Sequence, residues 1–285
     1  MNLRHILPCF LLFAGLSIGS ASHSLAQDTA VPPDLINNLR HNLGDKIRFC
    51  IDEGSPVAAF NRELSLAVAD ALFVEAEFVS APHAAYFPLD GDGYMAELQL
   101  LMSQSCEVYA GVSIVPGETG LYPDWTTVTR PFAEFSFVFL VGKDTYAALG
   151  DLPAGSKAGA IMGSAPQGLL LLHNGQRPKD KRLMLLPYGD PDLMLTRVLD
   201  GSIEGAAIYQ PLFVKMLEDK PEKFVGLKQV SFSPMSEPSV PVGYLLTAKD
   251  SYLRSQLDET IVALAKDGTI QSLIDRFGYQ GHAVP

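Results

Sequence analysis

The alternation of two hydrophobic patterns constrains this chain more than any other feature of its sequence. From Lys46 onward, short apolar or β-branched runs alternate with segments in which apolar residues recur at helical spacing. Parallel strands joined by crossover helices produce this pattern. The sequence therefore predicts an α/β fold, with strands at residues 47–51, 74–79, 108–112, 135–141, 158–162, 183–186, 205–209 and 242–246.

The alternation occurs twice along the chain, which predicts two lobes. Residues 135–141 and 242–246 are nearly continuous apolar runs, as expected for strands buried on both faces. Each run is followed by a Lys-Asp pair, at residues 143–144 and 249–250. Two such strands fit a hinge that connects the lobes.

The N-terminus is typical of a secretory signal peptide. Arg4 precedes an apolar block at residues 6–18, and residues 24–26 (Ser-Leu-Ala) form a cleavage site of the A-x-A kind. The block is interrupted by Pro8 and is shorter than the ~20 residues that a membrane span needs. We expect residues 1–26 to be removed and the remaining chain to enter the periplasm, without insertion into the membrane.

The charge of the chain argues against nucleic acid and anionic lipid as partners. The formal net charge is −11 at pH 7, and the leader, which holds one Arg and no acidic residue, takes one positive charge away when it is removed. Such a surface repels phosphate groups. The acidic residues either keep the protein soluble, which is our interpretation, or attract a cationic solute or metal.

No pattern in the sequence predicts a metal or cofactor site. The six histidines are scattered, and the chain has no HxxxH or CxxC motif. The run Asp-Gly-Asp-Gly at residues 90–93 resembles half of a calcium loop but lacks the distal glutamate. A turn followed by a helix cap is therefore the preferred interpretation.

Motifs spread over nearly the whole mature chain resemble those of the family 3 bacterial extracellular solute-binding proteins. They lie, in the order of that family, at residues 46–54, 103–117, 129–141, 157–172, 199–211 and 265–278. The resemblance implies a type II periplasmic binding protein: two α/β lobes joined by two hinge strands, with a solute in the interlobe cleft. It implies that lobe 1 contains residues 27–141 and 243–285 and that lobe 2 contains residues 142–242.

The resemblance also implies which residues line the cleft. In lobe 1 these are Asp52, Glu53 and Phe60 after the first strand, and Ser113 and Val115 after the third. In lobe 2 they are Gly163, Ser164 and Ala165 at a helix start, and Tyr209 and Gln210 at a strand end. Backbone N–H groups at the helix start can hold an anionic or carbonyl oxygen. Each residue has a loop or helix-cap role as its alternative, and Ser164 is also a suitable N-cap.

One departure from the family pattern bears on the ligand. Amino-acid-binding members carry an arginine a few residues after the motif that matches Gly111, Val112 and Ser113, and this arginine binds the substrate carboxylate. Residues 114–120 of this chain contain no basic residue. The departure argues against an ordinary α-amino acid as the ligand.

One branch of the family, the binding-protein-like partners of quinoprotein (methanol) dehydrogenases, resembles the chain more closely. Its members are similar at Cys50, at Cys106, at the strand end Gly111-Val112 and at the Thr-Arg-Pro-Phe motif of residues 129–132. The resemblance to this branch implies that the cleft holds a peptide segment or a cofactor-related molecule.

Three functions are compatible with these observations. The first, which we prefer, is capture of a small molecule for an inner-membrane ABC permease. The second is a non-catalytic accessory role for a periplasmic PQQ-dependent alcohol dehydrogenase. The third is a dehydratase, which needs a protonated carboxylic acid in the cleft; Glu53, Glu118 and Glu134 have no evident basic clamp beside them. The sequence has no Ser-His-Asp order, nucleophile elbow or phosphate loop, so we expect a monomeric binding protein and not an enzyme.

The two cysteines that follow the leader, Cys50 and Cys106, give conflicting signals. The oxidising periplasm and the family branch favour a disulfide. Aligning the carboxyl ends of the two strands, however, places Cys50 beside Ala110 and Cys106 about four residues away, or roughly 13 Å. A disulfide needs Cα atoms within about 7 Å. The strand register therefore predicts two free thiols.

Overall fold

The α/β fold is confirmed by the structure, a computed structural model that describes residues 45–83, 92–114, 122–143 and 146–284. The expected signal peptide at residues 1–26 and the first half of the Asp-Gly-Asp-Gly run lie outside the described residues. Within the described ranges, no helix is both long and apolar enough to cross a membrane.

The first part of the chain forms two strand-helix-strand units. Their elements are β1 (Lys46–Asp52), α2 (Ala58–Ala71), β2 (Glu75–Ala81), α3 (Asp92–Gln104) and β3 (Val108–Ser113). β1 lies between β2 and β3 and pairs with both in parallel. The sequence of α2 explains its packing, because Phe60, Leu64 and Val68 recur at helical spacing and all three are buried.

The second part of the chain repeats this organisation. Its elements are β4 (Thr126–Val128), β5 (Ala133–Val141), the 3-10 turn η2 (Leu149–Asp151), β6 (Lys157–Ile161), α4 (Ala165–Gln176), the 3-10 turn η3 (Lys179–Lys181), β7 (Met184–Tyr188), α5 (Pro191–Leu199), β8 (Gly205–Tyr209), α6 (Gln210–Asp219) and β9 (Lys228–Val230). β6 lies between β7 and β8 and is parallel to both. Side chains cap two of the helices: Ser164 at α4 and Asp190 at α5.

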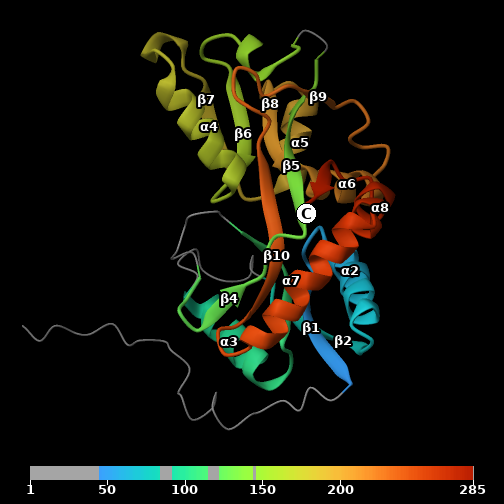
Figure 1. Cartoon of the computed structure of the whole chain (residues 1–285). Coiled ribbons are helices and arrows are strands. Elements are labelled where there is room, and N and C mark those ends of the chain that lie inside the picture. Colours follow the sequence, from blue (N-terminus) through green and yellow to red (C-terminus); the bar gives the residue numbers. More distant parts are fainter. Residues whose placement is uncertain (1–44, 84–91, 115–121, 144–145, 285) are drawn as a thin grey trace, which may run out of the picture.

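β5 and β10 (Ser239–Thr247) connect the two groups of strands in the order β2-β1-β3-β10-β5-β8-β6-β7. In Figure 1 they run between an upper group of elements and a lower one. Residues 133–136 of β5 pair with β10, and residues 137–141 pair with β8. β5 thus changes partner several residues before position 141, whereas β10 changes from β5 to β3 at Val242.

The two ends of the described chain share one hydrophobic core. α7 (Ser251–Lys266) and α8 (Thr269–Arg276) precede β11 (Gly281–Ala283), which pairs with β5. Leu257, Ile261 and Ile274 are fully buried in one cluster with Phe60 and Leu64 of α2. Figure 1 shows α7 lying diagonally across the lower group, beside α2. The C-terminal helices therefore pack on the β1–β3 side of the molecule.

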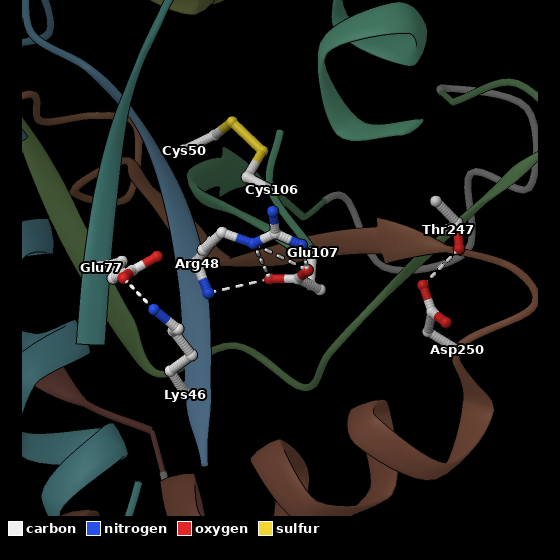
Figure 2. Close-up of polar contacts among 8 residues, drawn as sticks. All are labelled: Lys46, Arg48, Cys50, Glu77, Cys106, Glu107, Thr247 and Asp250. Atoms are coloured by element: carbon white, nitrogen blue, oxygen red, sulfur yellow. Dashed lines mark hydrogen bonds and ion pairs between the residues drawn. A yellow bond between two sulfur atoms is a disulfide. The ribbon is translucent and has the colours of Figure 1, made fainter. Parts of the chain in front are cut away.

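The prediction of two free thiols is wrong, because Cys50 and Cys106 form a disulfide with Cα atoms 5.8 Å apart (Figure 2). Cys50 lies opposite Tyr109, one position earlier in β3 than the alignment of strand ends assumed. More importantly, Cys106 precedes β3 and lies in the loop that connects α3 to β3. It packs there with Leu98 and Met102 of α3 against Cys50. The helix layer thus places Cys106 over the sheet and not along the axis of the strand.

Phe73 follows α2 in a backbone conformation that suits glycine. Its φ is +57° and the residue is 95% exposed. The left-handed conformation costs a non-glycine residue about 1–2 kcal/mol, and glycine is common at this position after a helix. We expect Phe73→Gly to raise the free energy of unfolding by about 1 kcal/mol in urea denaturation. The control Tyr252→Gly removes a similarly exposed ring from within α7 and should lower it; a loss of stability in both variants would contradict the interpretation.

Candidate functional site

A cavity of about 290 Å³ lies between the carboxyl ends of the two groups of strands. One wall contains Ser113, the last residue of β3, together with Ser55 and Val57 from the segment after β1. A second wall comes from the ends of β6 and β8 and the starts of α4 and α6: Ile161, Ser164, Ala165, Pro166, Ala207, Ile208, Tyr209 and Leu212. Phe137 of β5 and Val240 and Val242 of β10 complete the lining. Open α/β sheets bind ligands at this place, outside the carboxyl ends of their strands.

A β-bulge at Gly111 shapes the first wall. Consecutive residues of β10 pair with Ala110 and Val112, so Gly111 is an extra residue in β3. Its φ is +89°, and a Cβ atom at this position would lie 2.2 Å from Nδ2 of Asn61. Asn61 is buried and donates from Nδ2 to the carbonyl oxygen of Ala110 at 3.4 Å. Only glycine fits between these groups, and the bulge brings backbone to the cavity wall.

Ser113 is held in place by a tyrosine from a later segment. The hydroxyl of Tyr122 donates to the carbonyl oxygen of Ser113 at 2.6 Å. Burial raises the pKa of Tyr122 to about 12, with a further contribution from Tyr94, so this donor keeps its proton at neutral pH. The hydroxyl of Ser113 itself has no hydrogen-bond partner within the described ranges, and Ser113 lines the cavity.

The start of α4 satisfies most of its own polar groups. Oγ of Ser164 accepts a hydrogen bond from the N–H of Gln167 at 3.4 Å and donates to the carbonyl oxygen of Ile161 at 2.5 Å. The N–H of Gly163 donates to Oε1 of Gln167 at 2.8 Å. Ser164 is therefore the N-cap that we considered as its alternative role, although it also lines the cavity. Gly163 is not part of the lining.

Tyr209, the last residue of β8, lines the cavity. Its ring packs against Phe135 and Phe137, with ring centroids 6.3 and 5.7 Å away. Burial raises the pKa of Tyr209 far above its usual value, and Tyr279 adds to the shift. Because the phenol stays protonated, it is a neutral donor at physiological pH. In the described part of the chain its hydroxyl has no hydrogen-bond partner.

The two carboxylates expected in the cleft are engaged elsewhere. Asp52 accepts from the N–H of Gly54 at 2.9 Å and is hydrogen-bonded to Nδ1 of His83 at 2.8 Å. Glu53 is exposed and forms an ion pair with Arg62. Neither lines the cavity, and none of the described lining residues carries a charge. Among the residues that the structure describes, no three His, Cys, Asp or Glu side chains gather to hold a metal ion.

Three further residues expected in the cleft are placed differently. Phe60 is fully buried in the core, where its ring meets Phe135 edge to face at 5.3 Å. Gln210 is buried as well, donates to the carbonyl oxygen of Gly278 at 3.2 Å and accepts from the N–H of Gln280 at 2.9 Å. It thereby ties α6 to the C-terminal segment. Val115 lies outside the described residues.

The structure thus brings four of the expected residues to the cavity: Ser113, Ser164, Ala165 and Tyr209. Sequence reasoning missed the contribution of β5 and β10 through Phe137, Val240 and Val242. A continuous apolar run has no alternation that tells which residues face a cavity. One signal could have revealed this contribution: both apolar runs were assigned to the hinge, and a strand that connects two lobes runs past the cleft between them.

No protein-family model matches the chain, and no curated protein sequence matches it. Solved structures do match it at low sequence identity. Substrate binding domain 2 of Lactococcus lactis GlnP, in an open conformation, is 14% identical, with a TM-score of 0.61 over 84% of this chain and 98% of that one. The L-cystine solute receptor of Neisseria gonorrhoeae, unliganded and open, is 18% identical, with a TM-score of 0.59 over 86% of this chain and 95% of that one.

A third match is an ancestral amino acid-binding protein described as a precursor of cyclohexadienyl dehydratase. It is 16% identical, with a TM-score of 0.53 over 82% of this chain and 95% of that one. These likenesses establish the fold. The expected two-lobed periplasmic binding protein fold is therefore confirmed, and the cavity lies where the two lobes meet.

Proposed function

We propose that this chain is a solute-binding protein that holds a small molecule between its two lobes and delivers it to an ABC importer. The observation that carries the proposal is a cavity whose lining comes from both groups of strand ends and from the two strands that connect them. A ligand that touches both walls favours the closed arrangement of the lobes. The solved structures that share this fold include a substrate binding domain and a solute receptor.

The cellular context and the lobe limits belong to the same proposal. Residues 1–26 are the leader that exports the chain to the periplasm, and the mature protein acts there as a monomer. The partner in the inner membrane is an ABC permease. We place the first crossing between lobes near Ser136, where β5 changes partner, and the second at Val242.

The association with a quinoprotein alcohol dehydrogenase is a second candidate function. The disulfide between Cys50 and Cys106 is compatible with it, since these cysteines are among the residues that carry the resemblance to that branch, together with Gly111-Val112 and the motif at residues 129–132. The genes that flank this one discriminate between the candidates. Permease and ATPase genes support the importer, whereas a dehydrogenase gene with a cytochrome c gene supports the accessory role.

The positions of the carboxyl groups fit a binding protein better than they fit a dehydratase. Glu53 is paired with Arg62, and Glu134 is hydrogen-bonded by Ser239. Neither residue lines the cavity. Acid catalysis needs a carboxyl group within hydrogen-bond reach of the substrate, and the described lining offers none.

Native mass spectrometry of the purified protein tests the proposed function. We expect a small-molecule adduct that is lost on denaturation. Ser113→Trp fills the cavity from an exposed strand end and should remove the adduct without changing the circular dichroism spectrum. Ser80→Trp, the same change at an exposed position of β2 away from the cavity, should retain it. Absence of an adduct from the wild type, or equal occupancy in both variants, counts against the proposal.

A further inference from the structure

The cavity combines an apolar lining with a small number of hydroxyl groups. Its hydroxyls belong to Ser55, Ser113, Ser164 and Tyr209, and most of its remaining lining is aliphatic or aromatic. Ligand sites of this composition bury an apolar body and use their few polar groups to orient it.

The described residues of this cavity offer no cationic side chain to a carboxylate ligand. None of the described lining residues is Lys, Arg or His. The sequences of residues 84–91 and 115–121, which follow β2 and β3, contain none of these residue types either. Placing an unpaired carboxylate in an apolar cavity carries a large desolvation penalty.

The backbone at the start of α4 is also a poor partner for an anion. The N–H of Gly163 donates to Gln167 and the N–H of Ser164 donates to the carbonyl oxygen of Ile161 at 3.1 Å. Pro166 has no N–H. Only the N–H of Ala165 is left without a partner among the described residues. One donor suits a carbonyl or hydroxyl oxygen, whereas an anion needs several.

An ammonium ligand is disfavoured because the described lining of the cavity contains no carboxylate to pair with it. Among the described residues, the candidate carboxylates nearest along the chain to Ser55 in the cavity wall, Asp52 and Glu53, do not line the cavity and already have partners in Gly54, His83 and Arg62. A zwitterion such as a free α-amino acid combines both difficulties.

We infer that the cavity binds an uncharged organic molecule with an apolar body and a hydroxyl or carbonyl group, and not a free amino acid or another carboxylate. The inference rests on the proposed function and names the class of solute. The Ser113 hydroxyl on the β1–β3 side and the Tyr209 phenol on the β6–β8 side are the groups that orient this molecule. Since they come from opposite lobes, a ligand that bonds to both holds the lobes together.

Three probes of similar size with the same phenyl ring test the charge preference: benzyl alcohol, benzoate and benzylammonium, titrated at pH 7 and followed by ligand-observed NMR. We expect benzyl alcohol to bind at least tenfold more tightly than either charged probe. Tyr209→Phe and Ser113→Ala each remove one hydroxyl and should weaken the binding of benzyl alcohol about threefold to tenfold. The control Ser80→Ala should leave it unchanged, and Ser113→Trp should abolish it.

The outcomes separate the ligand class from the proposed function. Benzoate or benzylammonium binding as tightly as benzyl alcohol, with loss in Ser113→Trp, overturns the ligand class and leaves the solute-binding function standing. If no probe binds and the purified protein carries an adduct, the chemical identity of that adduct, determined from its mass and fragmentation, decides: a molecule without a carboxylate or ammonium group supports the inference, and a carboxylate, an amine or a zwitterion overturns it. If no probe binds and no adduct is found, the proposed function and the inference both fail.

Discussion

Replacing both disulfide cysteines, in the variant Cys50→Ala/Cys106→Ala, should lower the free energy of unfolding by roughly 4 kcal/mol. The bond joins residues 56 positions apart, and a crosslink restricts the unfolded chain more as the loop grows, from about 3 kcal/mol for ~15 residues to about 4.7 for ~100. Both cysteines are fully buried against α3, so their substitution also removes packing. Urea denaturation monitored by circular dichroism measures the change.

The wild type with its disulfide reduced separates the covalent bond from the packing. It retains both sulfur atoms, so its loss of stability reports the crosslink, and the further loss in the double alanine variant reports the packing. The reductant should leave the stability of the variant unchanged. A reduced wild type as stable as the oxidised protein would show that the disulfide contributes nothing to the folded state.

The main helices and strands could be predicted from the sequence, because the burial of each element requires apolar residues in a characteristic pattern. The strand expected at residues 47–51 is β1 (Lys46–Asp52), and the run expected at residues 135–141 is the greater part of β5. The short strands β4, β9 and β11 escaped prediction. A three-residue strand has no measurable period, and its pairing depends on neighbours that the sequence does not reveal.

The disulfide shows where a register argument from sequence fails. Extrapolating β3 backwards as a straight strand placed Cys106 too far from Cys50. In the structure, Cys106 lies before the start of β3 at Val108, in the short segment that connects α3 to β3. This segment packs with α3 against Cys50 and does not continue the line of the strand. The position of a loop residue above a sheet depends on helix packing, and no local pattern encodes it.

The candidate site was predictable where a residue's place in its element fixes its direction. Ser164 caps a helix and Tyr209 ends a strand at the carboxyl edge of the sheet, and both line the cavity; Asp52, which also ends a strand, does not, because its carboxylate is engaged with Gly54 and His83. Phe60 was expected there because the family resemblance places a cleft residue at its position after β1. Its position within α2 instead directs its ring into the core with Leu64 and Val68. Which face of a helix points toward a cavity depends on tertiary packing, and the spacing of apolar residues alone does not reveal it.

The ion pair between Arg48 and Glu107 predicts the second large effect on stability, next to the disulfide (Figure 2). Glu107 is only 5% exposed; its Oε2 accepts from the N–H of Arg48 at 2.8 Å, and its Oε1 from Nε of Arg48 at 3.1 Å. Removing one partner of a buried pair costs about 3–5 kcal/mol, because the other charge keeps its desolvation penalty. The Arg48 side chain is 25% exposed, so we expect Glu107→Ala to lower the free energy of unfolding by about 3 kcal/mol, at the lower end of that range.

Figure 2 also contains the matched control, the pair Lys46–Glu77, which joins the same strand β1 to its other neighbour, β2. Its side chains are 43% and 39% exposed, and exposed pairs contribute about 0–1 kcal/mol. Glu77→Ala should therefore change the free energy of unfolding by less than about 1 kcal/mol. Glu107→Gln keeps an acceptor for the N–H of Arg48 but loses the charge, so its effect should lie between those of the two alanine variants. Equal losses in Glu107→Ala and Glu77→Ala would mean that burial of Glu107 adds nothing to the strength of its pairing with Arg48.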